Sequence, residues 1–232
     1  MSNSKFYSNV HLYLTLGLII VFWGFSKSYF GRLGETALPY HVHGISATLW
    51  MVILIIQPYL YRINKINLHR YLGWSTVILV PILTIAGAEM MRLMIQNQAN
   101  YPPNVVYRLA FIDALTLLGF IALYVLAIYS RKNLQLHSRF MVCTIFGPLN
   151  PAITRIFFAL GLAGSFDQSL TYSYLLIELA LFFIIWKERS STEMRFTYLP
   201  VLIFTIVQHL LMYSAENWSW WVSCMNAFAG YR

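Results

Sequence analysis

Long apolar stretches alternate with short polar turns along the whole chain. A helix needs about 20 mostly apolar residues to cross a bilayer core of about 30 Å, and seven stretches meet this requirement. They cover residues 10–29, 40–61, 68–90, 107–129, 140–163, 169–186 and 196–215. The turns between them are rich in Gly, Pro, Asn and Ser, which favour chain reversal. The pattern predicts an all-α, polytopic membrane helical bundle, with residues 1–232 forming a single integral membrane domain.

The segment 216–232 departs from this pattern, because it is too short for an eighth span and unusually aromatic. Tryptophan is enriched where a membrane meets water. We therefore expect an interfacial tail with Trp218, Trp220 and Trp221 at the level of the lipid headgroups.

Composition supports the membrane interpretation. The chain is 59% hydrophobic and only 10% charged, whereas a soluble domain carries about 25% charged residues. These values exclude a disordered chain and argue against an ordinary soluble enzyme. Two cysteines are too few for a disulfide scaffold.

The net charge of +8 is best interpreted as a topology signal. With the seven spans above, ten basic residues lie on the side of the N-terminus and six on the other. The first group is Lys5, Arg62, Lys65, Arg70, Arg131, Lys132, Arg139, Lys187, Arg189 and Arg195; the second is Lys27, Arg32, Arg92, Arg108, Arg155 and Arg232. We expect a cytoplasmic N-terminus, an outer C-terminus and a place in a bacterial inner membrane. Nucleic-acid binding is not needed to explain the charge.

Histidines fall into two layers of this topology. His69 and His137 begin the third and fifth spans on the cytoplasmic side, while His41 and His43 begin the second span on the outer side. His209 lies in the outer half of the seventh span, roughly 10 Å from its end at 1.5 Å per residue. An ionisable side chain is costly inside a bilayer and points to function by default.

The two cytoplasmic histidines occupy similar sequences. The turns YLYRINKINLHRYLGW and IYSRKNLQLHSRFMV each place basic residues and an Asn before a Leu-His pair, with an Arg shortly afterwards. His69 and His137 are the equivalent positions. This similarity predicts that the second and third spans, and the fourth and fifth, are related hairpins of a parallel repeat.

Histidine is the commonest metal ligand and also binds haem iron. His69 and His137 could hold an inner haem b, with Arg70 and Arg139 placed to meet its propionates. Together with a second haem on the outer histidines, this arrangement predicts electron transfer across the bilayer, with a quinone or a respiratory complex as a partner.

An outer site would combine His209 with His41 or His43. Residues two apart on a helix point about 200° away from each other, so we expect one of the latter two to be the ligand unless the chain is extended after Pro39. The outer group could instead bind a transition metal through His43, His209 and the carboxylate of Asp113.

Other polar residues suggest a pathway through the bundle. The motif GPLNP, residues 147–151, should kink or break the fifth span, because prolines 148 and 151 lack backbone donors. Asn150 is placed to compensate for the freed carbonyls. Arg155 and Glu178 could form an internal ion pair or line a pathway, which would suit a small-solute or proton transporter.

Simpler explanations compete with these sites. A histidine at the start of a span can sit at the interface without a ligand, and Arg70 and Arg139 can serve as positive-inside anchors. The chain lacks H-E-x-x-H, C-x-x-C-H and G-x-x-x-x-G-K-[ST], and its last span has no lysine for a retinal Schiff base. Whether the protein is an enzyme stays open.

The motifs HVHG, LHRYLGW and LHSRFM give the chain a family resemblance over residues 40–155. It resembles an uncharacterised family of bacterial predicted membrane proteins. The helix starts of that family match His69, Arg70, Leu72 and Gly73, and later His137, Arg139 and Met141. That family implies no activity. A weaker similarity to a family that matures haem–copper oxidases implies an alternative function, as a non-enzymatic assembly or interaction subunit of a respiratory oxidase. The histidine layers also resemble di-haem cytochromes of the b561 type, although the helix order does not match.

Overall fold

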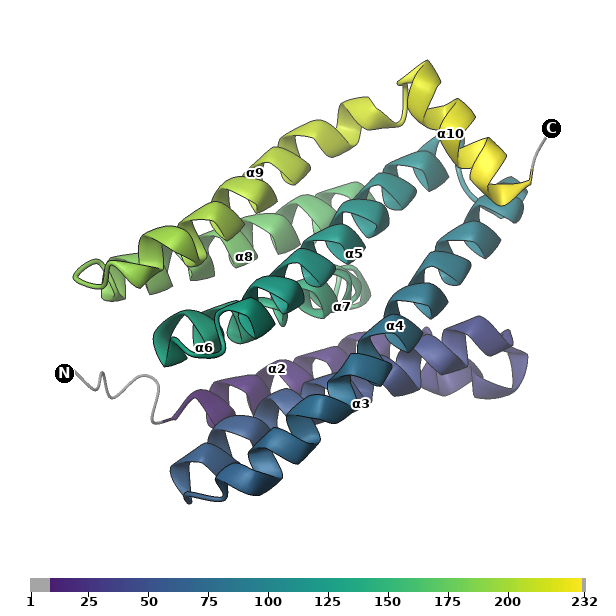
Figure 1. Ribbon diagram of the computed structural model, residues 1–232. Coiled ribbons are helices and arrows are strands. Elements are labelled where there is room, and N and C mark those ends of the chain that lie inside the picture. Colours follow the sequence, from purple (N-terminus) through teal and green to yellow (C-terminus); the bar gives the residue numbers. More distant parts are fainter. Residues whose placement is uncertain (1–8, 231–232) are drawn as a thin grey trace. The chain divides into compact units, whose positions relative to one another are not determined.

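The computed structural model describes residues 9–230, and it is almost entirely helical (Figure 1). No strand occurs within these residues. The α-helices are α2 (Val10–Phe25), α3 (Leu38–Arg62), α4 (Ile66–Gln96), α5 (Val105–Tyr129), α6 (Leu134–Cys143), α7 (Phe146–Ala159), α8 (Phe166–Lys187), α9 (Tyr198–Ala215) and α10 (Ser219–Ala229), with short 3₁₀ turns η1 (Phe30–Glu35), η2 (Gln98–Asn100) and η3 (Glu193–Phe196). Lys5 and Arg232, used above to infer orientation, lie outside the described residues.

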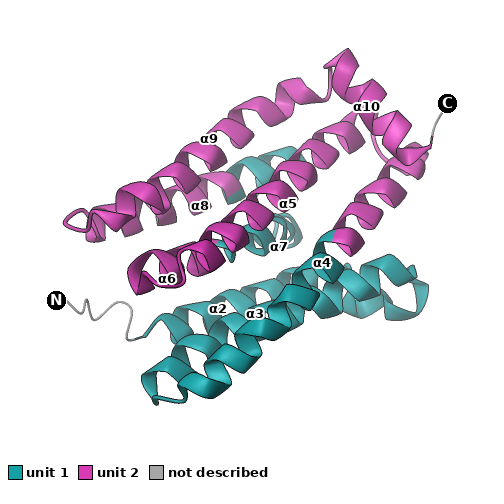
Figure 2. Cartoon of the chain, viewed as in Figure 1, with its two compact units in different colours: residues 1–84, 144–173 teal, residues 85–143, 174–232 magenta. Residues whose placement is uncertain are grey.

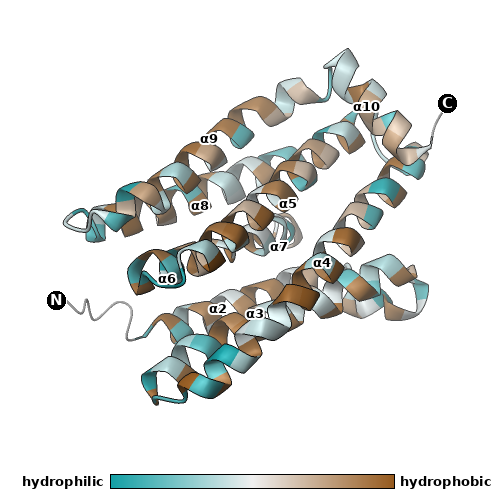
Figure 3. Cartoon of the chain, in the orientation of Figure 1, coloured by the Kyte–Doolittle hydropathy of each residue, from teal (hydrophilic) through white to brown (hydrophobic). Residues whose placement is uncertain are grey.

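Six helical segments are long and apolar enough to cross a membrane: Leu38–Arg62, Ile66–Gln96, Val105–Tyr129, Leu134–Ala159, Phe166–Lys187 and Glu193–Ala215. Figure 3 shows hydrophobic residues along the middle of α5 and α9 and hydrophilic residues near the turns that precede α6 and α9. Large side chains such as Ile78 and Leu210 are 70% and 71% exposed, as expected for surfaces that face lipid. The chain is an integral membrane protein.

The first predicted span forms a shorter helix than expected. Helix α2 has 16 residues and ends at Phe25, whereas the predicted span continued through the polar residues 26–28 to Tyr29. The Ser26 hydroxyl donates a hydrogen bond to the carbonyl of Trp23 at 2.6 Å. At 1.5 Å per residue the helix is about 24 Å long, below the usual length for a span.

The fifth predicted span is broken, as expected from its two prolines. The break lies upstream of Pro148 and Pro151. Helix α6 ends at Cys143 and α7 begins at Phe146. Pro148 has no N–H to offer the carbonyl of Thr144, four residues earlier, and its ring crowds that carbonyl. The helix therefore stops one turn upstream of Pro148, while Pro151 lies inside α7.

The described residues belong to two compact units (Figure 2). Unit 1 contains residues up to 84 and 144–173, and unit 2 contains residues 85–143 and from 174 onwards. The chain passes from one unit to the other within α4, at the break between α6 and α7, and within α8. Each unit is thus assembled from separate stretches of sequence.

In unit 1, α2 packs against α3 and α7. Two glycines on one side of α2 allow the close approach to α7. A Cβ atom added to Gly24 would lie 2.5 Å from the carbonyl oxygen of Ala152, and one added to Gly17 would lie 2.5 Å from the side chain of Ile145. Small residues at helix contacts are a usual feature of membrane bundles, because they let backbones approach.

In unit 2, α5 packs against α6, α9 and α10. The Gln208 amide donates to the carbonyl of Ile112 at 2.9 Å, which joins α9 to α5. The tail expected at the interface forms α10, an 11-residue helix. Its Trp221 is only 8% exposed and donates its indole N–H to the carbonyl of Tyr107 at 2.9 Å. At least this tryptophan therefore packs within the protein.

Candidate functional site: histidines with anchored rings

His137 bridges the hairpin formed by α5 and α6. Its Nδ1 atom lies 2.8 Å from the carbonyl oxygen of Ala127, ten residues earlier. Ala127 is in the last turn of α5, where carbonyls have no partner within the helix. The neighbouring amides of Ser130 and Arg131 bond to the carbonyls of Leu126 and Ile128. The imidazole thus supplies the donor that the Ala127 carbonyl needs.

His69 makes the corresponding bond in the hairpin formed by α3 and α4. Its Nδ1 lies 3.3 Å from the carbonyl oxygen of Gln57. The Gln57 side-chain amide returns a hydrogen bond to the carbonyl of His69 at 3.1 Å. Two hairpins with similar sequences therefore use their histidines in the same way, with the Nδ1 atom bonded to a backbone carbonyl of the preceding helix.

His41 and His43 face different neighbours. Helix α3 begins at Leu38 with Pro39 in its first turn, so both histidines are helical and the extended alternative does not apply. The Nδ1 atom of His43 lies 3.1 Å from the carbonyl oxygen of Leu83 in α4. His41 instead meets the Tyr29 hydroxyl, with 3.1 Å between Nδ1 and the phenol oxygen.

His209 has a charged partner. Its Nδ1 lies 2.9 Å from Oε1 of Glu178, and the two side chains are 13% and 15% exposed. The ring of Tyr174 stacks on the imidazole, with 4.8 Å between centroids and 14° between planes. Glu178 was considered above as a partner of Arg155, and the structure pairs it with His209.

These contacts decide the tautomer of three histidines. A carbonyl oxygen only accepts hydrogen bonds, so His43, His69 and His137 must carry their proton on Nδ1 when they are neutral. The lone pair then resides on Nε2. Histidines that bind metals usually have this arrangement, in which Nδ1–H donates to a carbonyl or a carboxylate. The same bonds also tie helices together, so they have a structural value without any ligand.

Each predicted pair of ligands combines a histidine of unit 1 with a histidine of unit 2. His43 and His69 belong to unit 1, whereas His137, His209 and Asp113 belong to unit 2. The pairing of His69 with His137, and of His43 with His209, stays a prediction from sequence. Among residues 9–230, no three His, Cys, Asp or Glu side chains gather into a metal-binding group. Asp113 is exposed on α5.

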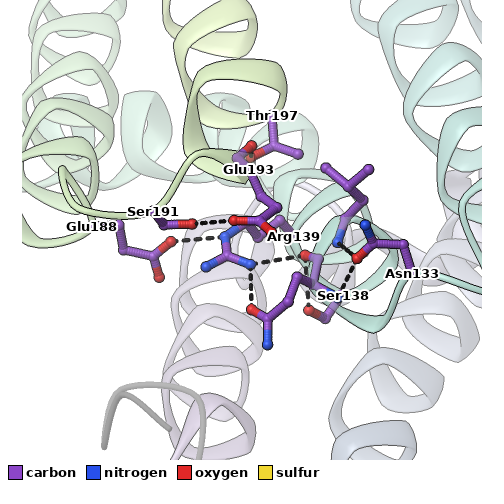
Figure 4. A network of polar contacts seen from close by, with 9 residues as sticks. Asn133, Ser138, Arg139, Glu188, Ser191, Glu193 and Thr197 are labelled. Atoms are coloured by element: carbon purple, nitrogen blue, oxygen red, sulfur yellow. Dashed lines mark hydrogen bonds and ion pairs between the residues drawn. The ribbon is translucent and has the colours of Figure 1, made fainter. Parts of the chain in front are cut away.

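The two arginines expected to meet propionates differ in environment. Arg70 is exposed on α4. Arg139 is only 4% exposed, and its Nε lies 2.8 Å from Oε2 of Glu188 (Figure 4). It also donates to the carbonyl and the side-chain oxygen of Gln135 at 3.0 and 2.6 Å. Arg139 therefore has a structural role that needs no cofactor.

Glu188 was not anticipated from the sequence, because it lies in a basic turn that resembles any cytoplasmic loop. Burial of its side chain, 6% exposed, distinguishes it from its neighbours. A second ion pair was also missed: Nη2 of Arg108 lies 2.7 Å from Oε2 of Glu216, and the guanidinium of Arg108 lies over the ring of Tyr213. Their separations of 49 and 108 residues leave no local signal.

Two of the residues expected to line a pathway, Asn150 and Arg155, form local contacts in unit 1. The amide oxygen of Asn150 accepts a hydrogen bond from Ser173 at 3.2 Å, and Ser173 contacts the Thr154 hydroxyl at 2.7 Å. Arg155 donates to the carbonyl of Pro151 at 2.8 Å and lies over the ring of Phe25. Asn150 thus joins α7 to the start of α8.

Comparison with models of protein families, with curated proteins and with solved structures gave no match. The function has to be inferred from the chain's own geometry.

Proposed function

We propose that this protein binds haem b, or a transition metal in its place, through Nε2 atoms of membrane-embedded histidines and takes part in electron transfer. The ligands are His43, His69, His137 and His209. The observation that supports the proposal is the engagement of all four Nδ1 atoms, by carbonyls in three cases and by a carboxylate in the fourth. A neutral, oriented imidazole with its lone pair on Nε2 is the form that binds iron.

Haem suits these residues better than a metal held by several side chains. Haem iron needs one or two protein ligands, whereas structural and catalytic zinc sites use three or four. Neither unit, within residues 9–230, brings three ligand side chains together. Arg70 is exposed at the start of α4, so a propionate could interact with it.

The cofactor would supply a reversible one-electron centre. The protein's own residues would hold the imidazole rings in one tautomer and exclude water with apolar helices. The electron partner would be a quinol or a respiratory complex, in a bacterial inner membrane with the N-terminus inside. Helix α2 would then cross the bilayer as a seventh, short span.

The visible spectrum of the protein, purified in detergent after expression with a haem precursor, tests the proposal. We expect a Soret band, with a shift on dithionite reduction and at least one haem per chain. Replacement of His137 by Ala should lower the haem content, and so should replacement of His43. His11→Ala is the matched control, because this histidine in α2 is outside the ligand set. Absence of both haem and any stoichiometric metal in the wild-type protein would contradict the proposal.

A further inference from the structure

Helix α8 presents two side chains to the imidazole of His209. Tyr174 and Glu178 are four residues apart and therefore share one face of the helix. The tyrosine ring stacks on the imidazole with 4.8 Å between centroids, and the glutamate accepts from Nδ1 at 2.9 Å. The stacked tyrosine thus fixes the plane of the His209 ring, and the hydrogen bond to Glu178 fixes the direction of Nδ1.

The partner of His209 differs in charge from the partners of the other histidines. His43, His69 and His137 face neutral carbonyls, whereas His209 faces a carboxylate. A hydrogen bond to an ionised acceptor is roughly twice as strong as one between neutral groups. With both side chains about 85% buried, little solvent screens the interaction. The carboxylate draws the Nδ1 proton away from the ring and increases the electron density at Nε2.

Tyr174 contacts His209 through its aromatic ring. The Tyr174 hydroxyl itself has no hydrogen-bond partner among residues 9–230. The ring of Tyr174, rather than its hydroxyl, therefore makes the contact with His209.

We infer that Glu178 and Tyr174 are positioning residues for His209. They make the Nε2 lone pair of His209 a stronger donor to a bound metal than the lone pairs of the other three histidines. The inference rests on the proposed function. A cofactor on His209 should bind more tightly, and have a lower midpoint potential, than one whose histidines face only carbonyls. The protein would then contain ligands of two distinct strengths.

Replacement of Glu178 by Gln tests this inference, because glutamine keeps the shape and removes the charge. We expect haem, or Zn²⁺ used as a probe, to bind roughly 10- to 100-fold more weakly, and the midpoint potential of the remaining haem to rise. Glu89→Gln is the matched control, since its carboxylate is 43% exposed and pairs with Arg92 in α4. Size-exclusion chromatography in detergent checks that both variants fold.

The tyrosine is tested by a pair of substitutions. Tyr174→Phe keeps the stacked ring and should leave the affinity and the potential unchanged. Tyr174→Leu removes the ring and should weaken binding. Wild-type affinity and potential in Glu178→Gln, or unchanged haem binding in His209→Ala, would overturn the inference alone. Failure of the wild-type protein to take up haem or metal would overturn the proposed function, and the inference with it.

Discussion

The Nδ1 atom of His137 donates to the carbonyl of Ala127 across the turn between α5 and α6, at 2.8 Å. Ala127 is fully buried, so its carbonyl cannot obtain a donor from water. The bond has two effects. It supplies a donor for a carbonyl in the last turn of α5, and it places the lone pair of the neutral ring on Nε2.

Replacement of His137 by Leu should destabilise the protein even when no cofactor is bound. Loss of the donor leaves a buried carbonyl unsatisfied, which costs about 1–3 kcal/mol. Unfolding in detergent micelles, followed by tryptophan fluorescence, measures the change. His41→Leu is the comparison, because the partner of His41 is the half-buried hydroxyl of Tyr29, which can turn towards water. Equal costs for the two variants would contradict this explanation.

The buried ion pair between Arg139 and Glu188 predicts strong coupling. Arg139→Met or Glu188→Leu alone should cost about 3–5 kcal/mol of unfolding free energy, because each leaves a buried charge without its counterion. The double variant should recover most of that loss, since two apolar side chains can fill the space. A double-mutant cycle measures the coupling, and additive effects of the two substitutions would argue against it.

Gly24 should tolerate no side chain. Alanine would place its Cβ 2.5 Å from the carbonyl oxygen of Ala152. The two atoms would overlap, so the backbone of α2 or of α7 would have to move. We expect Gly24→Ala to cost about 1–3 kcal/mol, as overpacked helix contacts do. Gly34→Ala is the control, because a Cβ there meets nothing within 4 Å. A melting temperature of Gly24→Ala equal to that of the wild-type protein would show that α2 and α7 can separate without loss.

Cysteine labelling tests the predicted orientation. Cys224 is exposed and Cys143 is buried, so a maleimide that cannot cross membranes should react with Cys224 in intact cells. A cysteine in place of the exposed Lys132, in a chain with Cys224 changed to Ser, should react only after the cells are opened. Reaction of the two positions from the same side would overturn the assigned topology.

Apolar run length was a reliable guide to the helices, because a bilayer demands the same length of every span. The six long helices begin and end within a few residues of the predicted limits, apart from the longer α4 and the earlier start of the broken fifth span. The break itself followed from Pro148, whose missing N–H is a local property. The early end of α2 was missed, although the predicted span closed on the polar residues Ser26, Lys27 and Ser28.

The partners of the polar residues were beyond the reach of sequence reasoning. The flanking residues showed that His69 and His137 occupy equivalent positions. They did not show which carbonyls the two histidines contact, since the backbone carbonyl of any residue can accept a hydrogen bond. Tyr174 was not anticipated from the sequence, although its spacing of four residues from Glu178 is that of one helix face. That spacing could not show that His209, 31 residues from Glu178, lies against that face.

The Arg139–Glu188 pair also sets a constraint on biosynthesis. The glutamate is 49 residues downstream of the arginine, so at about 5–20 residues per second it leaves the ribosome roughly 2 to 10 s later. During that interval the guanidinium of Arg139 lacks the carboxylate that it pairs with in the folded protein. Helix α6 should therefore complete its packing only after α8 has been synthesised, which makes assembly of this part of the bundle a late step.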